Sequence, residues 1–170
     1  MNRHGTARVE LPTDREIVIT RQFDAPAGLV FDLWTTPEHV RRWWSSESAP
    51  VVVCDIDLRV GGRWRYVTRD DQGIELGWTG VYREIVPGER IVASEVFEGY
   101  PDAEALNTLV LHEDEGVTTL TVTVLHTTRE HRDGHVASGM EPGMQQSMNR
   151  LEDLLVSGLD HPVPTREPAA

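Results

Sequence analysis

The chain has 170 residues, of which 39% are hydrophobic and 26% charged, and its formal net charge is -12. This length and composition are typical of one globular domain with a sizeable core. The acidic balance argues against nucleic-acid partners and anionic membranes, and no run approaches the roughly 18 apolar residues that a membrane-inserted helix needs.

The two ends of the chain differ from its middle. Residues 1–14 mix polar residues with Gly and Pro, which predicts a flexible N-terminal segment, and residues 159–170 are Pro-rich and predict a flexible tail. The N-terminus has no apolar signal segment, so we expect a cytoplasmic protein. Residues 15–158 are therefore expected to form a single domain.

Cys54 is the only cysteine of the chain. An internal disulfide and cysteine-based zinc sites are therefore excluded. Because Cys54 lies in the apolar run "APVVVCDIDL", we expect a buried, unreactive thiol.

The first predicted elements are a strand over residues 15–23 and two short helices. Asp24 and Pro26 mark the start of the first helix, and Pro37 ends it and opens the second, "PEHVRRWW". Adjacent helical residues point about 100° apart, so Trp43 and Trp44 cannot both face the same way. We expect one ring to pack inward and the other to line a cavity mouth or a partner surface.

Residues 51–126 predict β structure almost throughout. Six runs of β-branched and aromatic residues are separated by short turn signals, including Gly61-Gly62 and Pro87-Gly88. Short hairpin connections predict an antiparallel meander.

The last elements are predicted to be a short helix followed by a long one. Capping-box spacing starts each of them, with Thr127 and Glu130 in the first and Ser138 and Glu141 in the second. Helices at both ends of a continuous antiparallel run predict an α+β fold, in which the long helix covers a curved sheet.

The long helix carries an apolar stripe at steps of three and four residues, formed by Met140, Met144, Met148, Leu151 and Leu155. The stripe has two interpretations at this point. It packs on an ordinary core, or it forms one wall of a cavity that holds a ligand.

Four segments, taken in order and spacing, resemble the START-like (SRPBCC) superfamily: "ITRQFDAPAGLVFDLWTTPEHVRRWW", "DLRVGGRWRYVTRDDQG", "WTGVYREIVPGERIV" and "SGMEPGMQQSMNRLEDLL". The most similar branch is named after the activator of the 90-kDa heat-shock protein ATPase (AHSA-like), and the resemblance extends to polyketide cyclase-like proteins. It covers about residues 15–157.

The resemblance implies a helix-grip fold, with about six to seven curved antiparallel strands around a long C-terminal helix and two short helices after the first strand. Such proteins often keep an apolar cavity that binds lipids, sterols, polyketides or flavonoid-like molecules. Some are cyclases or hydrolases, and the eukaryotic namesake is a co-chaperone. Its separate N-terminal domain has no counterpart in this chain, which argues against a chaperone partner.

Strand alternation and the helical stripe together predict the lining of a ligand cavity. The alternative is that the same side chains simply fill the core. The predicted ligand-binding residues are Trp44, Trp64, Tyr66, Trp78, Tyr82, Phe97, Met140, Met144 and Met148.

Glu95 and His126 are predicted on the same inward face and are the candidate catalytic acid or base. The plain alternative is a pair of hydrogen-bonded core residues. His131 and His135 have a spacing that can bind metal on a helix, but Gly134 weakens that helix and no third ligand is near in sequence. We expect neither a metal nor a cofactor.

Three functions remain open at this stage. The favoured one is binding of a hydrophobic small molecule for sequestration, transport or sensing. The second is an enzyme of the cyclase, dehydratase or hydrolase kind that uses the same cavity, and the third is a co-chaperone-like interaction module. We expect no nucleic-acid partner and no membrane insertion, and a homodimer is left open.

Overall fold

The computed structural model describes residues 2–158. Its single antiparallel sheet has eight strands in the order β1-β2-β8-β7-β6-β5-β4-β3. These strands are β1 (Arg8–Glu10), β2 (Glu16–Phe23), β3 (Val51–Ile56), β4 (Arg63–Arg69), β5 (Glu75–Val86), β6 (Arg90–Phe97), β7 (Ala105–Asp114) and β8 (Val117–His126). The helices are α1 (Ala27–Thr35), α2 (Pro37–Trp43), α3 (Arg129–Ala137) and α4 (Met140–Ser157).

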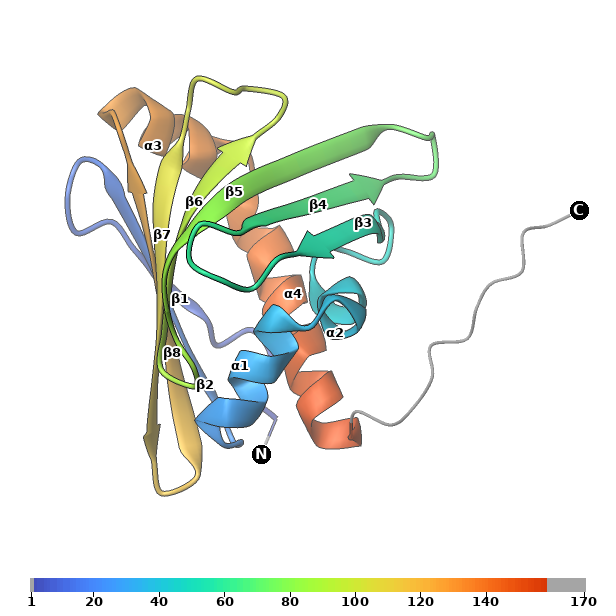
Figure 1. Cartoon of the computed structure of the whole chain (residues 1–170), viewed down its shortest axis with the longest axis vertical. Helices are drawn as coiled ribbons and strands as arrows, with labels where there is room; N and C mark the ends of the chain where they lie inside the picture. Colours follow the sequence, from blue (N-terminus) through green and yellow to red (C-terminus); the bar gives the residue numbers. More distant parts are fainter. Residues whose placement is uncertain (1, 159–170) are drawn as a thin grey trace, which may run out of the picture.

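The sheet curves around α4, while α1 and α2 lie on the same side of the sheet, at the end away from α3 (Figure 1). This arrangement confirms the predicted α+β fold and its helix-grip layout. The apolar stripe of α4 packs on the core: Met148 and Leu151 are buried, and Met140 and Met144 contact the core from its margin. None of the helices within residues 2–158 is long and apolar enough to cross a membrane.

The segment before residue 15, which was predicted to be flexible, contains regular structure within the described residues. Residues 8–10 form β1, which pairs with β2 and adds one strand to the number predicted. Before β1, the backbone N–H of Arg3 donates to Glu152 Oε1 at 2.8 Å, and that of Gly5 donates to Asn149 Oδ1 at 2.9 Å. Polar side chains of α4 thus hold a segment that has no periodicity of its own. The predicted tail at 159–170 lies outside the described residues.

The helix starts differ in detail from the predicted caps. At α1 the N–H of Ala27 donates to Glu113 Oε2 of β7 at 2.8 Å, so a distant strand replaces the expected Asp24 cap. Thr128, rather than Thr127, caps α3, and Gly139 precedes α4 without a side-chain cap. Gly139 has φ of 80°, a left-handed backbone that Gly adopts without the strain of other residues.

A bulge in β5 changes which side chains face inward. The register shifts between Tyr82 and Glu84, so that Tyr82 lies opposite Ala93 and Glu84 lies opposite Val92. Strict alternation predicts Glu84 on the inner face with Tyr82, but the extra residue turns its side chain out to solvent. There Glu84 pairs with Arg90 at 3.2 Å.

Candidate functional site

An inner cavity of about 110 Å³ lies on the concave side of the sheet. Its walls come from β4 to β8, from α1, and from the residue that follows α2. The lining residues are Trp34, Trp44, Trp64, Tyr66, Tyr82, Ile91, Ala93, Glu95, Asn107, Leu109 and Val122.

Trp43, the last residue of α2, and Trp44, which follows it, pack in different surroundings. Trp43 is 2% exposed, and its indole Nε1 donates to the Leu33 carbonyl at 2.8 Å. Trp44 is half-buried and meets Tyr66 and Trp78 edge-on, with ring centroids 5.2 and 4.8 Å apart. Trp43 therefore anchors α2 to α1, while Trp44 covers one side of the cavity.

Trp64 reaches across the sheet because the neighbouring strand carries a glycine. Its indole Nε1 donates to the Ser94 carbonyl at 3.2 Å, passing over Gly80. A Cβ at position 80 would lie 2.5 Å from that nitrogen and 1.8 Å from the Ser94 oxygen. Any other residue at position 80 would displace the Trp64 ring from the cavity wall.

The polar groups of the cavity are two phenols, one carboxyl and one amide. Glu95 Oε2 accepts a hydrogen bond from Asn107 Nδ2 at 3.0 Å, and Asn107 Oδ1 is buried with no partner within residues 2–158. The hydroxyls of Tyr66 and Tyr82 make no hydrogen bond to any described residue. Burial raises the pKa of Glu95 and of both tyrosines, because the apolar surroundings disfavour their charged forms.

His126 lies on the same inner face as Glu95 but is not part of the cavity lining. The strand register places Glu95 opposite Ala105, and Ala105 opposite His126. His126 Nε2 lies 3.0 Å from His135 Nδ1 of α3. Burial, with the neighbouring charge of His135, lowers the pKa of His126 to about 4. Of the two candidate catalytic residues, only Glu95 contacts the cavity.

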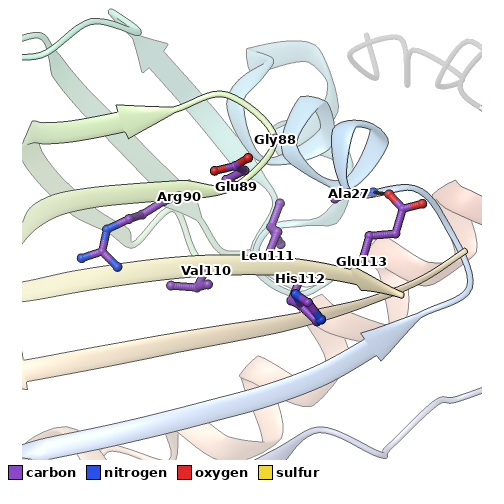
Figure 2. A pocket seen from close by; sticks show the side chains of 8 residues that line it. All are labelled: Ala27, Gly88, Glu89, Arg90, Val110, Leu111, His112 and Glu113. Carbon is purple, nitrogen blue, oxygen red and sulfur yellow. Dashed lines mark hydrogen bonds between the residues drawn. The ribbon is translucent and has the colours of Figure 1, made fainter. Parts of the chain in front are cut away.

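A larger groove of about 480 Å³ lies elsewhere, between the β5–β6 turn, the end of β7 and the start of α1. Figure 2 shows Glu113 pointing toward the backbone of Ala27, with His112 next to it on β7 and Glu89 on the β5–β6 turn. These three side chains are exposed, and no Trp, Tyr or Phe lines the groove. Its greater volume therefore does not make it the better site for a hydrophobic ligand.

No group of three or more His, Cys, Asp or Glu side chains in the described part of the chain is arranged to hold a metal ion. Cys54 is buried, and burial raises the pKa of its thiol to about 11. A thiol with so high a pKa is rarely the reactive thiolate.

The family follows from a sequence match that spans most of the chain. Residues 24–156 match the family described as "Activator of Hsp90 ATPase homolog 1-like protein" (AHSA1). The chain belongs to this family. The match confirms the branch that the four sequence segments indicate, and it covers both short helices and every strand of the cavity wall.

Solved structures share the fold of this family member over nearly their whole length. A crystal structure from Rhodobacter sphaeroides is 26% identical, with a TM-score of 0.82, and the match covers 89% of this chain and 98% of that one. An NMR structure from Staphylococcus epidermidis is 28% identical, with a TM-score of 0.75 and coverage of 91% and 97%.

DynU16, a protein in the dynemicin biosynthetic locus, is 24% identical with a TM-score of 0.64. The match covers 86% of this chain and 49% of DynU16, so this chain spans about half of that protein. No curated protein matches the chain.

The structure brings some of the predicted ligand-binding residues together and separates others. Trp44, Trp64, Tyr66 and Tyr82 line the cavity. Trp78 and Phe97 stack on each other outside it, with ring centroids 5.5 Å apart. The stripe methionines Met140, Met144 and Met148 pack against the core and are not among the lining residues.

Six lining residues were not predicted as ligand contacts: Trp34, Ile91, Ala93, Asn107, Leu109 and Val122. Asn107 and Leu109 follow the alternation of β7, in which Ala105, Leu109 and Leu111 are buried. The amide of Asn107 within this inward-facing series was the signal that could have identified it as a lining residue. Trp34 could be recognised as a lining residue only from the packing of α1 against α2, where its ring centroid lies 4.6 Å from that of Trp43.

Proposed function

We propose that this family member binds a small hydrophobic, aromatic molecule in its inner cavity, for sequestration, transport or sensing. The observation that carries the proposal is an aromatic cavity in which two tyrosine hydroxyls, those of Tyr66 and Tyr82, have no hydrogen-bond partner among the described residues. Aromatic walls with a few polar groups are the usual lining of small-molecule sites. Buried polar groups in a finished core are instead nearly all hydrogen-bonded.

The cavity volume limits the size of ligand that fits without movement. Ligand sites commonly enclose about 300–1,000 Å³, and an apolar cavity of about 150 Å³ binds benzene. At about 110 Å³ the inner cavity matches the smallest of these ligands. A polyketide or flavonoid-like ligand would require displacement of Trp34 and Trp44, which are both half-buried.

Glu95 supports a second candidate function, an enzyme of the cyclase or dehydratase kind. Its carboxyl lines the cavity, and its pKa is raised by burial, which suits a group that holds a proton for transfer. No second titrating group with a base-like role lines the cavity, so binding is the better supported function. The place of DynU16 in a biosynthetic locus is the reason to include polycyclic aromatic compounds among the probes.

Filling the cavity tests the binding function directly. Ala93 lines the cavity, and replacing it with Leu should occupy part of the space and prevent ligand binding. Ala137→Leu makes the same change at an exposed position on α3 and is the matched control.

The measurement is a thermal-shift screen of the three proteins against single-ring aromatics, fatty acids, sterols, flavonoids and aromatic polyketides. A ligand at 100 times its Kd adds about 2.7 kcal/mol to the free energy of unfolding, which is a shift of several degrees. We expect such a shift in the wild type and in Ala137→Leu and its loss in Ala93→Leu. No shift with any class, or an equal shift in Ala93→Leu, would exclude binding in this cavity.

A further inference from the structure

Three of the polar residues that line the cavity, Tyr66, Tyr82 and Glu95, can donate a hydrogen bond. Tyr66 and Tyr82 are 8% and 5% exposed, and their hydroxyls have no partner among the described residues. Each hydroxyl therefore has a proton to donate and no group in residues 2–158 that accepts it. Tyr66, Tyr82 and Glu95 all line the same cavity, so the three groups are neighbours.

The Glu95 carboxyl can also donate a hydrogen bond when it is in its neutral form. Asn107 Nδ2 donates to Oε2, so Oε1 is the oxygen that remains for the acid proton. Burial raises the pKa of Glu95 and favours this neutral acid form. Three O–H groups on β4, β5 and β6 therefore converge on the same apolar space.

The cavity offers no positive charge to a ligand. None of its lining residues is Arg, Lys or His. An ionised carboxylate placed there would be buried without a counter-ion, which costs several kcal/mol. A hydrocarbon, on the other hand, would leave all three O–H groups without an acceptor.

We propose that Tyr66, Tyr82 and Glu95 form a hydrogen-bond-donating subsite that binds the carbonyl oxygen of an uncharged aromatic ketone or quinone. A carbonyl oxygen has two lone pairs and accepts two donors at once, which suits a cluster of O–H groups. The inference rests on the proposed binding function and names the ligand class: aromatic carbonyl compounds, in preference to hydrocarbons and to anionic fatty acids.

Three probes of one size and shape test the ligand class. Acetophenone carries the carbonyl, α-methylstyrene replaces its oxygen with a CH₂ group, and benzoate carries a full negative charge. NMR titration of the tryptophan indole N–H signals gives the Kd of each probe, because three tryptophans line the cavity. We expect acetophenone to bind about 3- to 10-fold more tightly than α-methylstyrene, as one or two hydrogen bonds allow. We expect benzoate to bind more weakly than either.

The two phenol hydroxyls can be removed without changing the shape of the rings. Tyr66→Phe and Tyr82→Phe should each weaken acetophenone about 3- to 10-fold and leave α-methylstyrene within about 2-fold. Tyr100→Phe is the matched control, because Tyr100 is 54% exposed and lies outside the cavity. Acetophenone labelled with ¹³C at the carbonyl should move to higher frequency on binding the wild type and move less in the two variants.

Each outcome bears on a different statement. If acetophenone and α-methylstyrene bind equally well, the cavity binds ligands but the donor subsite is wrong. The same holds if Tyr66→Phe and Tyr82→Phe weaken both probes alike, because the tyrosines then contribute only packing. If benzoate binds as tightly as acetophenone, the preference for uncharged ligands is wrong. Absence of binding by all three would contradict the subsite, whereas the Ala93→Leu comparison with larger ligands would still decide the binding function.

Discussion

His126 shows how one buried residue makes stability depend on pH. Burial holds its pKa at about 4 in the folded state, below the ordinary value of 6.5. The charged groups that act on it are His131, Arg132 and His135 of α3, and all of them disfavour a second positive charge. As pH falls from 6.5 to 4, the unfolded chain binds the proton first, so the free energy of unfolding falls.

The first prediction follows from this fall in the free energy of unfolding at low pH. His126→Asn should lose less stability than the wild type between pH 6.5 and 4, because its side chain does not titrate. His112→Asn, at an exposed position in the groove of about 480 Å³, should keep the full pH dependence. Urea unfolding midpoints at several pH values measure the difference, and equal slopes in the two variants would show that His126 is not the source.

Period-two alternation placed most inward residues of the sheet correctly, and it failed where the backbone is irregular. It placed Glu95 inside, where the structure has it at the cavity wall. It also placed Glu84 inside, but the bulge after Tyr82 turns that side chain out. A bulge depends on the pairing of two strands, and no pattern within β5 alone reveals it.

At the scale of elements, an ion pair between β2 and α4 fixes the helix on the sheet. Arg21 Nη2 donates to Glu152 Oε2 at 2.5 Å, and the Arg21 side chain is fully buried. Glu152 Oε1 also accepts the backbone N–H of Arg3. One carboxylate thus joins α4 to both strand β2 and the N-terminal segment.

The second prediction is that Glu152→Gln destabilises the protein by about 3–5 kcal/mol, because it leaves the buried Arg21 charge unpaired. Asp153→Asn is the control, since Asp153 is a largely exposed neighbour whose partner His4 is itself partly exposed. The double variant Arg21→Met with Glu152→Met should recover much of the loss, because no charge is then buried. A loss below 1 kcal/mol in urea unfolding of Glu152→Gln would contradict this account.

The elements themselves were largely predictable because their signals are local. The stripe that begins at Met140 predicted the buried face of α4, and the turn signals predicted the strand order of the meander. The helix caps and β1 were not predictable in the same way. The start of α1 and the segment that precedes β1 are held by Glu113 and Glu152, each of which accepts a hydrogen bond from a residue more than 80 residues away in sequence.

At the scale of the whole molecule, the open question about the fold was how much space remains on the concave side of the sheet. The sequence predicted an aromatic inner face of the sheet. It did not predict how much of the cavity the side chains fill, because that volume depends on how the rings of Trp34, Trp44 and Trp64 pack together. Trp34, Trp44 and Trp64 all lie against the same cavity, which leaves about 110 Å³. The space available to a ligand is therefore set by side-chain packing rather than by the curvature of the sheet.

The third prediction concerns this limit on ligand size. Trp44 is half-buried and follows the last residue of α2, so Trp44→Ala should open the cavity wall with a smaller loss of stability than a fully buried Trp would cause. The variant should bind flavone or another three-ring compound more tightly than the wild type does, while its affinity for acetophenone should fall because part of the wall is gone.

Trp78→Ala is the matched control, since Trp78 contacts Trp44 but does not line the cavity. Calorimetric titration with both ligands would measure the change. Tighter flavone binding in Trp44→Ala alone would assign the size limit to Trp44, whereas an unchanged flavone affinity would mean that larger ligands enter by movement of α1 and Trp34 instead.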